Sequence, residues 1–290
     1  MRVPRWGSLR WLPITLSRAL TNAMAVASAL AMAGATASAQ GGHTEKLHVN
    51  PAVKECSFQL DASLTQSAWR QFAGEAGVVT YFRPMSDARP MGAGKFEVSI
   101  MQWKTGIHAA DAAWNDTFVH PDSMHWLFEG DGLQFPGLML RTGVTEKTDL
   151  GVYLTKSPGA NYGFYGAQVQ HSLLQDAGKK WAGAARMSFV SMYGPKDLEF
   201  TVYGLDLVAS RKYAVFSKRA FVSPYAGVST SLSRAHEKTP AVNLADESVL
   251  RAQGMVGAAA QFSRAKLAVE YGLASVPSLS IKIGVGPRSN

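Results

Sequence analysis

The strongest constraint on the fold of this 290-residue chain is a period-2 alternation of apolar with small or polar residues that begins at Lys95. It runs in segments of about 8–14 residues, separated by turn-forming clusters such as Ser157–Asn161 and Gly194–Asp197. Successive side chains of a strand point to opposite faces of its sheet, so the alternation predicts an all-β fold. The expected strands are 95–106, 133–143, 148–156, 161–173, 181–193, 197–210, 219–232, 250–263, 265–274 and 278–286.

Soluble sandwiches and membrane barrels both alternate, so the composition of each face has to decide between them. One face of 181–193 has Trp181 at one end and Phe189 and Tyr193 at the other, and the opposite face has small residues around Arg186. A face exposed to water would carry more charge, whereas a barrel has an apolar lipid face with aromatic ends and a small, polar lumen face. We therefore expect an antiparallel up-and-down transmembrane β-barrel of about ten strands (8–12), with a short N-terminal helix.

Three details of the barrel follow from the same pattern. A three-residue loop, Ser275–Pro277, would place Glu270 directly opposite Lys282 on the lumen face. Near Gly204 the apolar positions change parity, from Leu198, Phe200 and Val202 to Leu205 and Leu207, which indicates a bulge or a misplaced strand. The two longest connections, 107–132 and 233–249, fall on the same side of a ten-strand barrel, the side expected to be extracellular.

The N-terminus predicts export. Four arginines precede any acidic residue, the apolar run Ala19–Ala35 follows, and Ala37–Ala39 ends in a small-x-small pattern. Residues 1–39 are therefore expected to be a cleaved signal peptide, with an uncleaved anchor as the alternative. Cleavage would remove four of 29 Lys and Arg and none of 21 Asp and Glu, which lowers the net charge from +8 to +4. A net charge of +4 is too small to indicate a nucleic-acid-binding surface.

Residues 40–94 precede the barrel, which is expected over 95–290. Leu64, Ala68 and Phe72 predict an amphipathic helix over 63–74, acting as a periplasmic cap, a lumen plug or an interfacial element. Val78–Phe82 predicts a brief strand, and a connector rich in Pro and Gly follows it. The single cysteine, Cys56, cannot form an internal disulfide and is expected to be a spectator thiol in a poorly packed segment.

A signal peptide followed by strands with aromatic ends resembles the small outer-membrane β-barrel proteins of Gram-negative bacteria. The stretch Pro90–Val98 also resembles the Gly-x-x-x-Phe-x-Val opening of uncharacterised barrels of that class. The resemblance implies an outer-membrane location, contact with lipid and lipopolysaccharide, and insertion by the barrel-assembly machinery. It carries over no catalytic residue. The chain lacks the usual terminal aromatic residue, so a soluble periplasmic β-barrel that binds an apolar ligand stays an alternative.

The long connections hold the candidate reactive groups. His120, Asp122 and His125 could ligate a metal, but the spacing of five between the histidines fits neither a helix nor a strand. A rim hydrolase could also use these three residues together with Ser123, His236 and Asp246, although no spacing among them places a nucleophile beside its base. We therefore expect a hydrated surface loop at 107–132 whose aromatic residues pack on the rim, with no metal, no cofactor and no enzymatic activity.

Inward-facing charges are the more informative feature. They form either a closed lumen network or an eyelet for small solutes. About ten strands enclose a narrow interior, so a plugged lumen is expected. The predicted function is a structural or surface-interaction role, with a narrow channel for small solutes as the alternative. The residues of this network are Glu97, Arg141, Arg186, Glu270 and Lys282.

Overall fold

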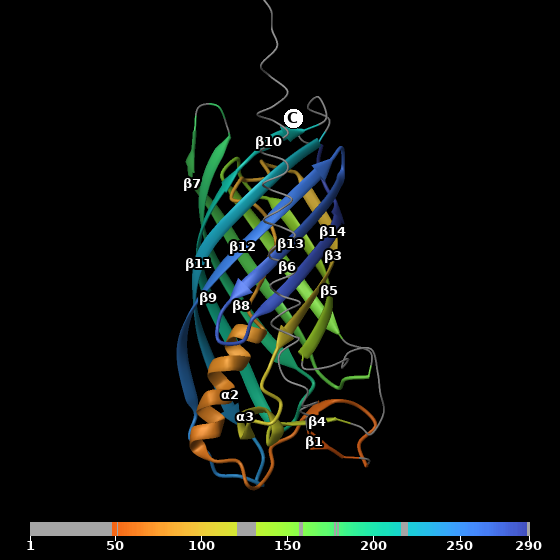
Figure 1. Cartoon of the computed structure of the whole chain (residues 1–290), viewed down its shortest axis with the longest axis vertical. Helices are drawn as coiled ribbons and strands as arrows, with labels where there is room; N and C mark the ends of the chain where they lie inside the picture. The colour runs from red at the N-terminus through yellow and green to blue at the C-terminus, as the bar shows by residue number, and fades with distance from the viewer. Residues whose placement is uncertain are drawn as a thin grey trace, which may run out of the picture. The chain divides into compact units, whose positions relative to one another are not determined.

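The computed structural model describes residues 48–50, 52–120, 132–156, 159–176, 178, 180–215 and 220–288. These residues belong to one compact unit, and the predicted signal peptide, 1–39, lies outside them. In this part of the chain, ten long strands close into an antiparallel barrel, because the last strand pairs with the first (Figure 1). In order around the barrel they are β3 (Phe96–Gly106), β5 (Gly132–Gly143), β6 (Thr148–Lys156), β7 (Gly163–Gln175), β8 (Trp181–Tyr193), β9 (Leu198–Arg211), β11 (Ala220–Glu237), β12 (Glu247–Phe262), β13 (Ala265–Leu273) and β14 (Ser278–Val285).

The ten strands confirm the predicted fold class and the ten predicted segments. The largest differences are at β11, which ends five residues later than expected, and at β12, which begins three residues earlier. The connection between them therefore shortens to 238–246. A further strand, β10 (Tyr213–Val215), pairs with β11 beyond the end of β9.

The barrel has two mouths. The loop mouth is the one with the connections 107–131 and 238–246, the two longest, as predicted. The turn mouth is the one where β3 begins and β14 ends, with short turns such as 144–147 and 263–264. At the loop mouth, β1 (His48–Val49), β2 (Ser57–Phe58) and β4 (Phe118–His120) form a small sheet beside the short helix α3 (Ala112–Asn115). The sequence did not predict α3.

The main helix, α2, spans Gln66–Val79 and is longer than the predicted 63–74. Thr65 caps its first turn, since the hydroxyl accepts from the Ala68 N–H at 3.3 Å. The strand predicted at Val78–Phe82 is wrong, because the helix continues to Val79 and the chain then runs as irregular backbone. The Arg83 guanidinium donates to the carbonyls of Val78, Val79 and Tyr81, which supplies the last helical turn with hydrogen-bond partners. No helix among the described residues is long and apolar enough to cross a membrane.

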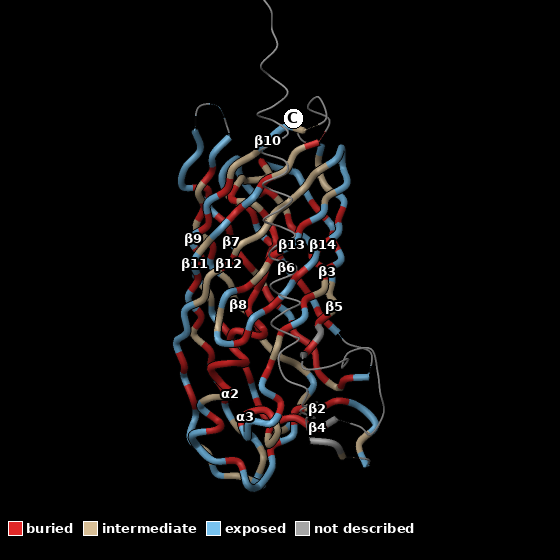
Figure 2. Tube along the Cα trace, in the orientation of Figure 1, coloured by how far each residue is buried: buried red, intermediate tan, exposed pale blue. Residues whose placement is uncertain are grey.

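Helix α2 lies inside the barrel, near the loop mouth (Figure 1). The Gln66 side chain bonds the backbone of Ala245 and the carboxylate of Glu247 where β12 begins, and the Trp103 indole of β3 donates to the carbonyl of Val79 at 3.1 Å. Residues 80–95, here called the connector, then run through the lumen to the turn mouth, where β3 starts. Residues 80–86 of the connector are buried, and Figure 2 shows buried backbone inside the barrel. The helix and the connector therefore pack as part of the barrel.

Two detailed predictions were wrong. The β13–β14 ladder pairs Glu270 with Ser280, and Lys282 with Ala268, two residues away from the predicted register. A shift of two keeps every side chain on its face. In addition, no bulge or break occurs at Gly204, and β9 pairs regularly with both neighbours past this residue. The apolar residues change parity because Phe200 faces inward, where it packs on Phe72 of α2 with ring centroids 6.1 Å apart, whereas Leu205 and Leu207 face outward. The lumen changes from apolar to polar along β9, and the strand itself is regular.

Candidate functional site

The outer face of the barrel is apolar and has aromatic residues at two levels. Near the loop mouth, Phe189 of β8 lies between Tyr165 and Tyr203, with ring centroids 6.2 and 5.7 Å away. Near the turn mouth, the Arg211 guanidinium lies 5.0 Å from the ring centroids of both Trp181 and Tyr213. Such girdles mark the two interfaces of a membrane-spanning barrel.

The spacing of the girdles fits a membrane. Trp181 and Phe189 are eight residues apart on β8, which corresponds to about 20 Å at a rise of ~3.3 Å per residue and a tilt of ~40°. Between these levels the outward positions are mainly large aliphatic residues, such as Leu205, Val269 and Ile281, which are 42–50% exposed. A surface of this kind is favourable in hydrocarbon and unfavourable in water.

The lumen near the loop mouth is filled with aromatic side chains. Trp69 and Phe72 of α2 stack at 5.5 Å, and Phe72 meets the Trp114 ring edge-on at 5.2 Å. The Trp114 indole donates to the Glu75 carboxylate at 2.6 Å, so a polar atom of α3 and one of α2 satisfy each other inside this cluster. Each of the three rings is at most 1% exposed, so this half of the lumen is closed.

The predicted hydrated loop at 107–132 is thus wrong for its first half. Trp114 and Phe118 lie inside the barrel mouth, where α3 and β4 place them, and do not pack on its outer rim. Of the metal candidates, His120 ends β4, and Asp122 and His125 lie outside the described residues. Within the described ranges, no three His, Cys, Asp or Glu side chains are grouped as a metal site would need.

The rim candidates His236 and Asp246 do meet. The Nδ1 of His236 lies 2.6 Å from a carboxylate oxygen of Asp246, and both side chains are more than half exposed. A general base also needs a nucleophile within hydrogen-bond reach. The structure has no serine, threonine or cysteine side chain hydrogen-bonded to His236 in the part of the chain that it describes. The two side chains thus form an exposed contact at the loop mouth.

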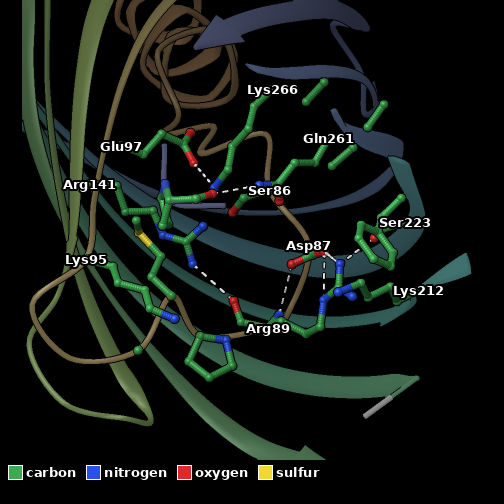
Figure 3. A pocket seen from close by; sticks show the side chains of 18 of the residues that line it. Ser86, Asp87, Arg89, Lys95, Glu97, Arg141, Lys212, Ser223, Gln261 and Lys266 are labelled. Atoms are coloured by element: carbon green, nitrogen blue, oxygen red, sulfur yellow. Dashed lines mark hydrogen bonds and ion pairs between the residues drawn. The ribbon is translucent and has the colours of Figure 1, made fainter. Parts of the chain in front are cut away.

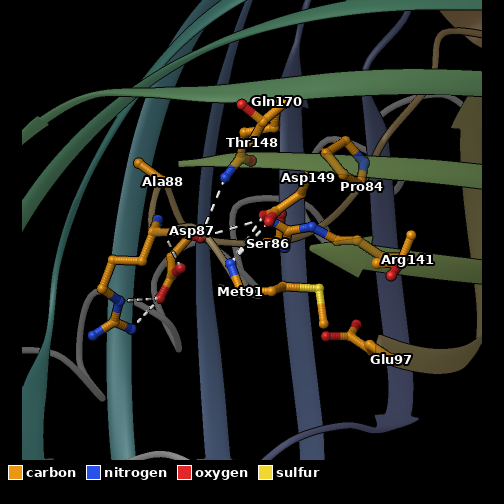
Figure 4. Close-up of polar contacts among 12 residues, drawn as sticks. Pro84, Ser86, Asp87, Ala88, Met91, Glu97, Arg141, Thr148, Asp149 and Gln170 are labelled. Carbon is orange, nitrogen blue, oxygen red and sulfur yellow. Dashed lines mark hydrogen bonds and ion pairs between the residues drawn. The ribbon is translucent and has the colours of Figure 1, made fainter. Parts of the chain in front are cut away.

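In the polar half of the lumen, charged side chains of the barrel strands form hydrogen bonds with the connector (Figure 4). The guanidinium of Arg186 donates to Gln170 at 2.8 Å and to the carbonyl of Ser86 at 2.7 Å. Arg141 forms a salt bridge with Asp149, and the Asp149 carboxylate accepts from the N–H of Met91 at 3.0 Å. These bonds satisfy backbone groups of the connector that have no sheet or helix partner.

Glu97 joins three parts of the lumen. Its carboxylate oxygens accept from Lys266 at 2.7 Å and from Lys282 at 2.9 Å, and Lys282 also donates to the carbonyl of Pro84 at 2.7 Å. Glu97 and Lys282 are 2% and 4% exposed. The first strand, the last two strands and the connector therefore meet at a single buried carboxylate, close to the seam where the barrel closes.

All five predicted lumen charges are buried inside the barrel, but only Glu97 and Lys282 bind each other. Glu270 instead accepts from the hydroxyl of Tyr225 at 2.9 Å. The partners that sequence reasoning missed are Asp149, Lys266, Asp206, Gln170 and Tyr225, of which Asp206 binds Tyr81 of the connector. The alternation of the strands could have identified these residues as lumen-facing, since all of them lie at inward positions. The connector has no periodicity, so its sequence could not show that it fills the lumen.

Between the connector and the turn mouth lies a cavity of about 320 Å³, here called the vestibule (Figure 3). Ser86 and Asp87 of the connector lie in its lining, together with Arg89, which binds both Asp87 and Ser223. Burial, with a smaller contribution from Arg89, lowers the pKa of Lys212 at the rim. The charged lining residues are Asp87, Arg89, Lys95, Glu97, Arg141, Glu146, Lys212, Lys266, Lys282 and Arg288.

A closed antiparallel barrel of ten strands, apolar outside and filled inside, has the architecture of outer-membrane β-barrel proteins. No family model and no curated protein matches the chain. Solved structures similar to it include the β domain of the Bordetella autotransporter BrkA (12% identity, 68% of this chain and 100% of that one, TM-score 0.39). Another is the translocator domain of the autotransporter NalP from Neisseria meningitidis (11% identity, 67% of this chain and 88% of that one, TM-score 0.34). A third is LpxR from Salmonella typhimurium (9% identity, 64% of this chain and 99% of that one, TM-score 0.34). At identities of 9–12%, the similarity concerns the fold alone.

Proposed function

We propose that this chain is an integral outer-membrane barrel of Gram-negative bacteria with a structural or surface-interaction role and no catalysis. The observation that carries the proposal is the filled lumen. Helix α2 and its aromatic neighbours close the loop-mouth half, and the connector occupies the other half with its backbone bonded to the wall. A narrow channel for small solutes is disfavoured, because conduction would require this packed segment to leave.

The orientation determines which surface is available to a partner. Outer-membrane barrels carry short turns on the periplasmic side and longer loops outside. By that rule the loop mouth faces outward, together with residues 52–65 and the loop 238–246. The helix would then be an outward plug, and a periplasmic cap is not compatible with this orientation. The apolar band would contact outer-membrane lipid and lipopolysaccharide after insertion by the barrel-assembly machinery.

Cell fractionation and electrophoresis test the location. We expect the mature chain in the outer membrane, with a band that migrates differently before and after boiling because the closed barrel resists detergent. Recovery in the soluble periplasm with no heat-dependent shift would overturn the proposal in favour of a soluble barrel.

Planar-bilayer recording and surface proteolysis test the role and the orientation. The purified protein is expected to be electrically silent, and steady single-channel currents would contradict the filled lumen. A protease site inserted after Pro240 at the loop mouth should be cleaved in intact cells, whereas the same site after Gly178 at the turn mouth should be cleaved only after the outer membrane is opened. The reverse pattern would invert the orientation.

A further inference from the structure

The vestibule has more positive than negative charge. Among the described residues, seven cationic side chains line it against three carboxylates, and Asp149 behind Arg141 adds a fourth. The excess of three positive charges lies within one cavity of about 320 Å³. Like charges gathered on concave, low-dielectric walls focus a field that attracts counter-ions.

The carboxylates of the vestibule are already engaged. Asp87 binds Arg89, and Glu97 binds two lysines at once. Glu146 accepts from the N–H of Ala93 at 3.3 Å. Within the described part of the chain, neither Lys95 nor Arg288 forms a salt bridge. Internal salt bridges of the described residues therefore do not neutralise Lys95 or Arg288.

The shape of the vestibule suits a small ligand. Its volume lies at the lower end of the ~300–1,000 Å³ range of small-molecule pockets. The connector runs across its inner side, with the Arg186 guanidinium holding the carbonyls of Ser86 and Asp87 from behind. The cavity thus has a fixed floor and side chains that project from several strands (Figure 3).

We propose that the vestibule binds a small polyvalent anion, and that phosphate is the chemistry that it fits best. Lysine ammonium groups are compact point charges with rotatable donors, and arginine adds a planar fork, so together they match the several acceptor oxygens of a phosphate group. The phosphate could belong to a free anion or to a lipid headgroup. The proposal goes beyond the proposed function and does not depend on which mouth faces outward.

Isothermal titration of the full-length protein in a neutral detergent tests this site. Inorganic pyrophosphate is the free-anion probe, and short-chain phosphatidylglycerol below its micelle concentration is the headgroup probe. The variant Lys95→Gln, Lys212→Gln, Arg288→Gln removes three rim charges without touching the buried pairs. We expect about a tenfold or greater loss of affinity for the probe that binds, and binding by the unaltered protein that weakens as salt is added.

A matched control removes three positive charges at the loop mouth, by Lys54→Gln, Lys196→Gln and Lys238→Gln. The proposal is supported if the control keeps the affinity of the unaltered protein. Preferential binding of pyrophosphate identifies a free anion, and preferential binding of phosphatidylglycerol identifies a headgroup. Binding of neither probe, or equal losses in both variants, would overturn it. The heat-dependent shift of each variant shows that its barrel is closed.

Discussion

Glu97 shows how single residues organise this lumen. It lies at the start of the first strand, and its two lysine partners come from the last two strands. The desolvation of a buried carboxylate is costly unless cations and hydrogen bonds compensate for it. Here two lysines and the Ser99 hydroxyl, which donates at 3.0 Å, provide that compensation.

The first prediction concerns this contact. Glu97→Gln leaves Lys282 buried without its carboxylate and should destabilise the barrel by about 3–5 kcal/mol, the usual effect of breaking a buried pair. Urea unfolding followed by tryptophan fluorescence in detergent measures the change. The matched control is Glu199→Gln, which breaks an exposed salt bridge with Lys238 at 2.9 Å and should have a much smaller effect. Equal effects would show that Glu97 is not a buried ionic centre.

A second prediction concerns Cys56, which was expected to lie in a poorly packed segment. That expectation was wrong, because Cys56 is fully buried, its N–H donates to the carbonyl of Gly159 at 2.8 Å, and burial raises the pKa of its thiol to about 12. Since the thiolate is the nucleophile, a maleimide should label the folded protein very slowly at pH 8 and label the urea-unfolded protein rapidly. Rapid labelling of the folded protein would show that this segment separates from the barrel.

At the scale of elements, close packing against the wall places α2 in the lumen. A side-chain carbon added at Gly77 would lie 2.8 Å from the Cβ of Ser233 on β11, and one added at Gly74 would lie 2.8 Å from the Arg251 guanidinium on β12. Glycine costs helical stability, so its presence twice within one turn reflects the close approach of the helix to the strands.

The third prediction tests this packing. Gly77→Val should push α2 away from β11, lower stability by about 1–3 kcal/mol as overpacking does, and produce intermittent currents in planar bilayers where the unaltered protein is silent. Ser67→Val is the control, because it adds a similar side chain at an exposed position of the same helix. If Gly77→Val stays silent and as stable as the control, then the contact between helix and wall does not close the lumen.

At the scale of the whole molecule, the barrel is apolar on two surfaces that have different partners. The outer band would face lipid in the proposed membrane location, and the inner surface near the loop mouth faces α2 and α3. Phe135 and Phe164 belong to the inner set, and Leu138 and Leu154 to the outer set. Most charged lumen residues lie in the half that contains the connector, whereas polar side chains such as Thr105 and Ser233 are also buried in the loop-mouth half.

The fourth prediction distinguishes a membrane barrel from a soluble one. Ile281→Arg places a charge in the middle of the outer band and should cost about 2–4 kcal/mol in a bilayer, measured as the loss of the heat-dependent band shift after refolding into liposomes. Val144→Arg is the control, since Val144 is 59% exposed but lies in a turn at the turn mouth. Equal tolerance of both changes would indicate that the band faces water.

The local pattern of the sequence was sufficient to predict the barrel. The period of two, the turn clusters and the aromatic ends of 181–193 are short-range features, and they predicted ten strands, the faces of β8 and the mouth that holds the two longest connections. The inward positions of Glu97, Arg141, Arg186, Glu270 and Lys282 followed from the same parity.

Only the tertiary structure decided what fills the barrel. The register of β13 on β14, the partners of Glu270 and the inward turn of Trp114 depend on atoms far away in sequence, and a shift of two residues leaves the alternation unchanged. The helix adds an apolar surface inside the lumen. Phe200 and Val202 are therefore apolar at inward positions, where barrel strands usually have small or polar residues, and the strand itself stays regular. Alternation thus determines which side of a strand a residue faces, whereas what it meets there depends on how the whole chain packs.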